Sequence, residues 1–301
     1  MNTLPKTISV FAPAKINMFL HITGKKSNGY HILDSLVCFA DIGDKITIQE
    51  ADSFSFHVTG EFSDAFSKQH KAPNIDCENL VVKAARRLAQ ITEKPLNMRI
   101  TLEKNLPLAA GLGGGSSDAA STLWGLQEFW RISRQEEYLL PLMTNLGADV
   151  PVCLHCAPSI MRGIGDELSP APDLPEIPIL LVNPMMNCPT QNVFLHYTPQ
   201  FKTNTQWPST FRTSLDFVTA LKDTENDLYD AALQAVPEIE NIIHTINVQK
   251  DCLISRMSGS GASCFGLFET IESAKKAKEV ILQDNPDWWA QTGWLNRPER
   301  Y

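Results

Sequence analysis

The chain has 301 residues, of which 43% are hydrophobic and 20% are charged, with a net charge of −8 and an isoelectric point near 5.4. This composition is typical of a soluble globular protein, and the length suffices for roughly two domains that share a cleft. The acidic balance argues against a nucleic-acid partner, because a protein that binds a phosphate backbone needs a basic surface.

The sequence also argues against a membrane partner. The N-terminal run lacks the charged, apolar and small-residue order of a signal peptide, and no apolar stretch approaches the about 20 residues that cross a bilayer. Seven cysteines, an odd number scattered along the chain, favour reduced thiols in a cytosol. We therefore expect a cytoplasmic protein.

The first half of the chain mixes predicted strands with predicted helices. Apolar alternation predicts strands over 8–22 (interrupted at Pro13), 46–49, 54–58 and 96–102. Asn79 is placed to cap a helix that runs to about residue 91, because apolar residues recur there at helical spacing. Two further helices are expected over 116–129 and from about Arg134 to 145.

Lys15 lies inside the first apolar strand pattern. A buried lysine is unfavourable unless it meets an anion, but a lysine at a strand edge can also extend to solvent. The residues alone leave both interpretations open. Asn17 comes two residues later and therefore faces the same side of the strand, where it could contact a substrate.

A glycine-rich segment precedes the helix predicted from about Ser116. Four glycines (Gly111, Gly113, Gly114 and Gly115) occupy five positions. Glycine permits positive φ and lets a ligand approach the backbone without a Cβ in the way. A helix start directs free N–H groups and a positive dipole end at such a loop, so the segment predicts an anion site suited to a nucleotide phosphate.

This loop is neither of two common phosphate motifs. A Walker A loop needs G-x-x-x-x-G-K-[ST], which is found nowhere in the chain. A dinucleotide fingerprint needs a third glycine, which is missing after Gly111 and Gly113 and again after Gly259 and Gly261.

Asp149 follows a Gly-Ala pair and precedes Val-Pro. An acid in a short loop between apolar segments is well placed as a base, although such an aspartate also commonly starts or caps a turn.

Cys153 and Cys156 have the spacing of half a zinc site, but no second pair lies nearby. The alternation of Val150, Val152 and Leu154 predicts instead a buried strand that carries these cysteines as small hydrophobes.

The second half reads as α+β with a small antiparallel sheet. The proline-dense segment 169–178 cannot continue a helix or a central strand, so we place a domain boundary there, between 1–168 and 169–301. A long polar loop, expected to be flexible, covers 199–213. Strands are predicted at 179–182, 252–255, 264–268 and 288–295, and helices near 216–222, 237–245 and 271–283.

Five segments in this order resemble the signatures of the GHMP kinases, a superfamily of small-molecule ATP kinases. They are Ala12-Pro-Ala-Lys-Ile-Asn17, Gly29-Tyr30-His31, the glycine loop, Leu146-Gly-Ala-Asp-Val-Pro151 and Met257-Ser-Gly-Ser-Gly-Ala-Ser263. The match spans nearly the whole chain. The Gly29-Tyr30-His31 triplet and the Gly-Gly-Gly-Ser-Ser spelling favour a member that acts on a cytidine diphosphate sugar alcohol over a mevalonate or homoserine kinase.

The resemblance implies an α+β, two-domain GHMP kinase fold. Its N-terminal domain would be of the ribosomal protein S5 domain 2-like type and would bind ATP, and its C-terminal domain would be ferredoxin-like. The expected cofactors are ATP and Mg²⁺, although no carboxylate cluster marks metal ligands, so we assign no metal-binding residue. The expected partner is the small-molecule substrate, and the protein would be a monomer or a homodimer.

The resemblance also implies roles for single residues. Asp149 would take the proton from the acceptor hydroxyl, and Lys15 would hold this acid ionised. The ATP-binding residues would be Pro107, Leu108, Ala109, Ala110, Gly111, Leu112, Gly113, Gly114, Gly115, Ser116 and Ser117. The substrate-binding residues would be Asn17, Tyr30, His31, Thr190 and Phe194.

For the cytosine ring, Tyr30 offers a stacking face and His31 offers hydrogen-bonding groups, although an aromatic residue after a glycine can also simply pack under a turn.

Ser258 and Gly259 would support the phosphate loop. We interpret Asp118 as stabilising the helix N-terminus through the dipole. Asn226 and Asp227 resemble a polar pair in relatives and receive no role.

Overall fold

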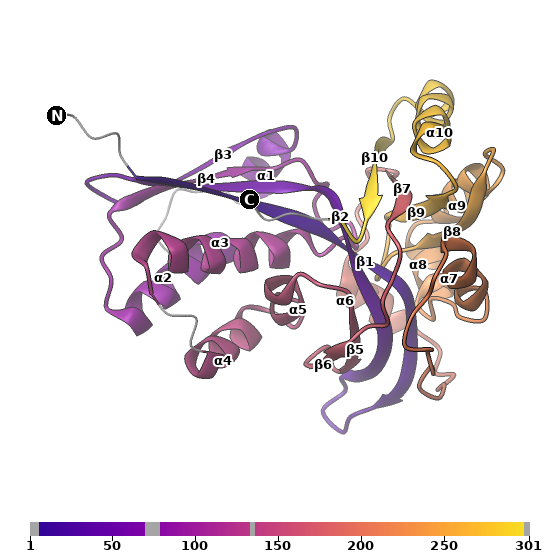
Figure 1. Cartoon of the computed structure of the whole chain (residues 1–301), viewed down its shortest axis with the longest axis horizontal. Coiled ribbons are helices and arrows are strands. Elements are labelled where there is room, and N and C mark those ends of the chain that lie inside the picture. The colour runs from indigo at the N-terminus through magenta and orange to yellow at the C-terminus, as the bar shows by residue number, and fades with distance from the viewer. Residues whose placement is uncertain (1–5, 70–78, 133–135, 298–301) are drawn as a thin grey trace.

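The computed structural model describes residues 6–69, 79–132 and 136–297 (Figure 1). Its first half contains β1 (Thr7–Lys25), β2 (His31–Glu50), β3 (Ser55–Thr59), α1 (Ser63–Gln69), α2 (Leu80–Thr92), β4 (Met98–Glu103), α3 (Gly114–Trp130), α4 (Glu136–Leu146), α5 (Val150–His155), β5 (Ser159–Gly163) and β6 (Glu167–Pro170). Its second half contains β7 (Ile177–Asn183), α6 (Thr190–His196), α7 (Ser214–Leu221), α8 (Tyr229–Ala235), α9 (Glu238–Asn247), β8 (Cys252–Met257), β9 (Cys264–Phe268), α10 (Ile271–Asp284) and β10 (Trp289–Leu295).

The long antiparallel strands β1 and β2 form the spine of the molecule. β1 pairs with β2 from Thr7 to Lys25, with register shifts near Pro13, Asn17 and Ile22. β2 also pairs with β4 over residues 45–50 and with β5 over residues 33–37. Figure 1 shows α2, α3, α4 and α5 together on one side of these strands, so the predicted mixture of helices and strands in this half is confirmed.

The second half forms an antiparallel sheet in the order β10-β7-β9-β8. If β7, β8, β9 and β10 are numbered 1 to 4 in chain order, the spatial order of the strands is 4-1-3-2. Helices α9 and α10 pack on this sheet at the end of the molecule away from α2 (Figure 1). One residue pair, Leu295 with Ala40, links this sheet to β2.

Strand β2 is much longer than the sequence predicts. The alternation of apolar and polar residues breaks at Asp34 and Ser35, two polar residues that are buried within the strand. Asp34 accepts hydrogen bonds from Arg162 Nε at 2.9 Å and Thr205 N at 2.6 Å. Ser35 donates to the carbonyl of Phe19 at 2.5 Å. Because these side chains find partners inside the protein, the strand continues through positions where polar residues interrupt the apolar pattern.

The prediction of a strand over residues 150–154 is wrong, because these residues form the helix α5. Pro151 occupies its first turn, where the missing N–H group is tolerated. Val150, Val152 and Cys153 are buried, whereas Leu154 is only partly buried. A six-residue apolar run does not separate the helical period from the strand period.

Two prolines of the segment 169–178 lie in strands, contrary to expectation. Pro170 ends β6, and Pro178 is the second residue of β7. Pro178 pairs with Trp294 of β10, whereas pairing with β9 begins only at Ile179. Pro178 therefore sits where the strand has a partner on one side, which a residue without an N–H group tolerates.

Most other predicted elements are confirmed with small shifts at their ends. The helix expected from Ser116 begins at Gly114, and the predicted start of α4 at Arg134 lies outside the described residues. The loop 199–213 is irregular, and it is held by a hydrogen bond from the Thr205 N–H group to the Asp34 carboxylate and by buried Phe211. Among the residues described, no helix combines the length and apolarity that crossing a membrane requires. Among the described residues, Cys38, Cys156, Cys188, Cys252 and Cys264 have free thiols.

Candidate active site

A pocket of about 990 Å³ lies where β1, β2, the glycine loop, α5 and α6 meet. This volume lies at the upper end of the range for small-molecule sites, so it can hold a nucleotide beside a second substrate. The predicted residues that line it are Lys15, Asn17, Tyr30, His31, Pro107, Leu108, Ala109, Ala110, Gly111, Gly113, Gly114, Gly115, Ser116, Asp149, Thr190, Phe194 and Gly259. Residues from distant parts of the sequence thus share one cavity.

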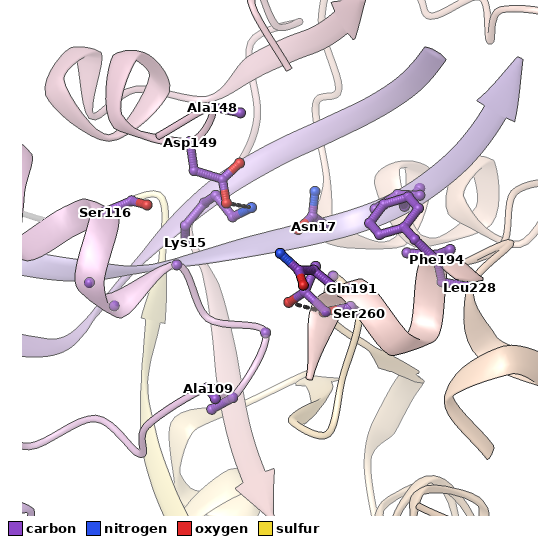
Figure 2. Close-up of a pocket in the computed structure, with 18 of the residues that line it drawn as sticks. Lys15, Asn17, Ala109, Ser116, Ala148, Asp149, Gln191, Phe194, Leu228 and Ser260 are labelled. Carbon is purple, nitrogen blue, oxygen red and sulfur yellow. Dashed lines mark hydrogen bonds and ion pairs between the residues drawn. The ribbon is translucent and has the colours of Figure 1, made fainter. Parts of the chain in front are cut away.

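Lys15 and Asp149 form an ion pair inside the pocket (Figure 2). Lys15 Nζ lies 2.8 Å from Asp149 Oδ2, and the exposed fractions of the two side chains are 6% and 32%. The aspartate is the residue before α5 and makes no capping hydrogen bond with its own helix, so the carboxylate is turned toward the lysine. A partly exposed carboxylate held by a buried ammonium can accept a proton from a hydroxyl that enters the cavity.

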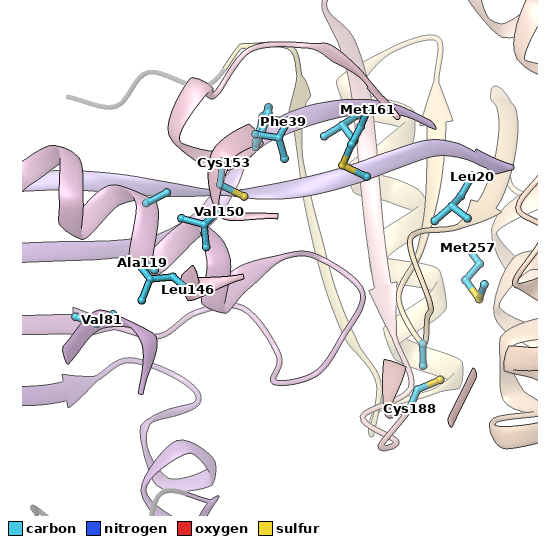
Figure 3. Packing of buried hydrophobic residues seen from close by; sticks show 14 of the residues in the cluster. Leu20, Phe39, Val81, Ala119, Leu146, Val150, Cys153, Met161, Cys188 and Met257 are labelled. Atoms are coloured by element: carbon cyan, nitrogen blue, oxygen red, sulfur yellow. The ribbon is translucent and has the colours of Figure 1, made fainter. Parts of the chain in front are cut away.

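Packing of α5 fixes the position of Asp149. Val150 and Cys153 of this helix point into the same apolar cluster as Phe39 and Met161 (Figure 3). Because the helix is anchored by these buried side chains, Asp149, the residue that precedes it, cannot move freely relative to β1.

Three consecutive carbonyls of the glycine loop accept hydrogen bonds from other parts of the protein. The Ala110 carbonyl accepts from Ser263 N at 3.1 Å, and the Leu112 carbonyl accepts from Lys15 N at 2.9 Å. The Gly111 carbonyl between them accepts from Ser258 Oγ at 3.0 Å. With three consecutive carbonyls engaged elsewhere, they do not repel an anion, and the free N–H groups at the start of α3 supply a binding surface for it.

The turn at Gly113 brings the loop against the lysine. Gly113 has φ +61, and a Cβ added to it would lie 2.9 Å from Lys15 Cβ. Only glycine allows this backbone conformation and this approach together.

Beneath the loop, Lys104 is buried between two carboxylates. Its Nζ pairs with Asp44 Oδ2 and lies 3.1 Å from Asp118 Oδ2. The interpretation of Asp118 as a helix-dipole partner is therefore wrong, because it lies beyond the first turn of α3 and faces this lysine instead. Burial, followed by the nearby Asp44, raises the pKa of Asp118 well above its usual value.

Replacing Lys104 by methionine should destabilise the fold by about 3–5 kcal/mol at neutral pH, because two carboxylates would remain buried without their cation. A carboxyl whose pKa is raised by folding favours the folded state below its unfolded pKa and loses that contribution as the pH rises. The defect should therefore shrink as the pH falls toward 4, which urea unfolding at several pH values would measure. Lys45→Met, an exposed neighbour on β2, is the matched control, and an equal loss in both variants would contradict this account.

Aromatic side chains gather at another part of the pocket. The His31 ring stacks on Phe194 with centroids 5.3 Å apart and meets Tyr197 edge-on at 5.5 Å. Tyr30 is 61% exposed and turns no large part of its ring into the protein. Burial, followed by the charge of Lys25, lowers the pKa of His31, so its neutral ring offers one donor and one acceptor at pH 7.

Three predicted site residues lie behind the pocket surface. Leu112, Ser117 and Ser258 are buried and do not line the cavity. Their contact with a ligand could come only through the loop they support.

Several pocket residues were missed in the sequence. Helix α6 places the missed Gln191 and Leu195 along the pocket beside the predicted Thr190 and Phe194, as positions one turn apart on one helix face do. Ser260 joins them, with its Oγ 2.9 Å from Thr190 Oγ1 (Figure 2). Recognising a helix over 190–196 would have revealed this face, whereas Ser260 lies within the Met257–Ser263 motif but received no role of its own.

Comparison with known proteins gives a consistent picture. Residues 79–157 match the family model described as the GHMP kinases N terminal domain, and residues 219–286 match the model described as GHMP kinases C terminal. A protein of Paramagnetospirillum magneticum named 4-diphosphocytidyl-2-C-methyl-D-erythritol kinase is 41% identical over 283 residues, or 94% of this chain and 96% of that protein.

Two solved structures share the fold. A 4-(cytidine 5'-diphospho)-2C-methyl-D-erythritol kinase has a TM-score of 0.77 at 29% identity, covering 97% of this chain and 100% of that one. A homoserine kinase from Cytophaga hutchinsonii has a TM-score of 0.71 at 15% identity, covering 100% and 99%, and this likeness concerns the fold alone. The predicted α+β fold class, with its ferredoxin-like second half, is confirmed.

Proposed function

The chain belongs to the GHMP kinase family and is a small-molecule kinase, and on that premise we propose that it transfers the γ-phosphoryl group of ATP to the 2-hydroxyl of 4-diphosphocytidyl-2-C-methyl-D-erythritol. This reaction belongs to the non-mevalonate pathway to isoprenoid precursors. The names of its relatives support this acceptor.

The observation that carries the proposal is the Lys15–Asp149 pair beside the glycine loop in one pocket. In the proposed step, the acceptor oxygen attacks the γ-phosphorus, the bond from this phosphorus to the β-phosphate oxygen breaks, and ADP leaves. Asp149 accepts the hydroxyl proton, and the Lys15 ammonium stabilises negative charge on the carboxylate and near the reacting oxygens. Phosphoryl transfer asks little more of a protein than positioning and charge.

We place ATP on the glycine loop with its triphosphate at the start of α3. The adenine would lie against Phe66, Leu80 and Leu108, which are apolar residues of the pocket lining. A Cβ added to Gly115 would lie 3.7 Å from Leu80 Cδ1, so that side chain borders the loop directly.

Mg²⁺ would arrive with ATP. In kinases this ion keeps several waters and takes one or two protein oxygens, so a three-residue cluster is not needed. Within residues 6–69, 79–132 and 136–297 there is no group of three His, Cys, Asp or Glu suited to a metal. The Ser116 hydroxyl, on the first turn of α3 and in the pocket, is the donor that would hold the ion. When bound, Mg²⁺ neutralises charge on the phosphates.

We place the cytosine of the acceptor at the aromatic part of the pocket, among Tyr30, His31 and Phe194. Thr190 would contact a phosphate, and Asn17 would contact the sugar alcohol near Lys15. Asn17 Oδ1 supports this placement, because it is buried without a hydrogen-bond partner in the described structure.

We also propose the division into an ATP-binding domain over 1–168 and a second domain over 169–301. Pairing of β1 to β6 among themselves supports it, with β10 as the connecting strand. A cytoplasmic location and a monomeric or homodimeric state remain predictions.

A coupled assay of ADP release tests the proposed acceptor. We expect turnover with 4-diphosphocytidyl-2-C-methyl-D-erythritol and none above background with mevalonate or homoserine. Turnover on either alternative, with none on the cytidyl substrate, would assign the chain to a different kinase of the family.

Replacing Phe194 by alanine should raise the KM of the cytidyl acceptor about 10-fold and leave the KM of ATP within about 2-fold. Loss of base stacking typically costs about 1–3 kcal/mol. Tyr30→Ala should act in the same direction. Steady-state kinetics with each substrate varied in turn measures this, and equal increases in both KM values would show that the rings serve the fold instead.

A further inference from the structure

The segment 225–227 has no place in the proposed chemistry, yet it is built into the structure around the pocket. Its backbone pairs with β1: Leu20 N donates to the Glu225 carbonyl at 3.0 Å, and Asp227 N donates to the Leu20 carbonyl at 2.8 Å. Asp227 Oδ2 also accepts from Ile22 N at 2.7 Å. The segment is thereby fixed to the strand that carries Lys15 and Asn17.

The side chain of Asn226 extends from this segment to the turn between β8 and β9. Its Nδ2 donates to the carbonyls of Met257 at 3.0 Å and Gly259 at 2.8 Å. Its Oδ1 accepts from Leu228 N at 3.0 Å. The residue is 8% exposed, so all three bonds are shielded from water. An amide is the side chain that can donate twice and accept once at this position.

The turn that Asn226 holds is itself bonded to the glycine loop. Ser258 Oγ donates to the Gly111 carbonyl at 3.0 Å and accepts from Asn17 N at 3.2 Å. Ser263, on the other side of the turn, donates its N–H to the Ala110 carbonyl. The turn therefore contacts both β1, which carries Lys15 and Asn17, and the glycine loop, on which we place the triphosphate.

From these contacts we infer that Asn226 is a positioning residue for phosphoryl transfer. It fixes the Met257–Gly259 backbone, and through Ser258 this turn sets the glycine loop at its distance from β1. Asn226 lines no part of the pocket, so it acts on the relative placement of the two substrates and not on the binding of either one. The inference rests on the proposed function for its kinetic part.

Asn226→Asp is the informative variant. It keeps the shape of the side chain and the oxygen that accepts from Leu228 N, but it turns a carboxylate oxygen toward the carbonyl oxygens of Met257 and Gly259. We expect kcat to fall about 10–100-fold, since a displacement of about 1 Å costs on the order of 10²-fold. The Kd of ATP and of the acceptor, each measured alone by calorimetry, should stay within about 3-fold. A protonated aspartate regains one donor, so the ratio of variant to wild-type kcat should rise as the pH is lowered.

Thr224→Val is the matched control. Thr224 is a buried residue of the same connection, and its hydroxyl bonds to the Leu221 carbonyl and Arg256, not to the turn. We expect it to lower the melting temperature while kcat stays within about 2-fold of wild type. A kcat loss equal to that of Asn226→Asp would reduce Asn226 to a general structural role and overturn the inference.

Hydrogen exchange provides a readout that does not depend on the acceptor. In Asn226→Asp, exchange should accelerate at the amides of Ser258, Gly261 and Ser263 and at the adjoining glycine loop, and in Thr224→Val it should not. Unchanged exchange together with an unchanged kcat would refute the positioning role. If the wild-type protein fails to phosphorylate the cytidyl acceptor while the exchange difference appears, the proposed function fails and the link from Asn226 to the glycine loop stands.

Discussion

Replacing Asp149 by asparagine is expected to lower kcat by about 10²–10⁴-fold, the range over which a positioned general base accelerates a reaction. The amide keeps the size of the side chain and can still lie near Lys15, but it does not accept the hydroxyl proton. The affinities for ATP and the acceptor should therefore stay within about 3-fold. Single-turnover rates and calorimetric Kd values measure the two effects separately.

Asp173→Asn provides the control for Asp149→Asn. It removes the same unit charge from an exposed position outside the pocket. We expect its kcat to equal that of the wild type. If Asp149→Asn also turns over at the wild-type rate, then Asp149 takes no part in the proton transfer.

Replacing Gly111 by alanine is expected to lower kcat/KM for ATP by about 10²-fold. Gly111 has φ +73, and an added Cβ would lie 2.5 Å from the Ser258 carbonyl oxygen and 2.8 Å from that of Gly261. Both are backbone atoms, so the loop or the turn must shift. A shift of this size disturbs the groups that face the triphosphate.

Gly163→Ala separates backbone strain from damage to the loop. Gly163 has a similar φ of +65, lies outside the pocket, and would place its Cβ against the movable side chain of Asp166. Both variants should lose stability in thermal unfolding. Only Gly111→Ala should lose ATP-dependent activity, and a wild-type kcat/KM for ATP in that variant would show that the loop does not hold the triphosphate.

The local parts of this site were predictable from sequence because their chemistry is local. Four glycines before a helix indicate an anion site wherever they occur, and an apolar strand pattern places Lys15 and Asn17 on one face. The resemblance to the GHMP kinases then joined Lys15 to Asp149, which the structure brings within 2.8 Å.

The parts that were not predictable depend on contacts between residues far apart in the chain. Lys104 is buried because Asp44, 60 positions earlier, meets it across the sheet, and no local pattern reveals that pairing. The helix α5 was mistaken for a strand because its apolar run is too short to show a period. Asn226 was noted in the sequence as part of a polar pair, but it received no role, because its partners Met257 and Gly259 are backbone carbonyls more than 30 positions away.

The most direct test is a crystal structure with a non-hydrolysable ATP analogue and 4-diphosphocytidyl-2-C-methyl-D-erythritol bound together. The account predicts the triphosphate on the amides of the glycine loop, and the 2-hydroxyl of the acceptor within about 3.2 Å of the Asp149 carboxylate and facing the γ-phosphate. A γ-phosphate that meets the acceptor away from both Lys15 and Asp149 would contradict it.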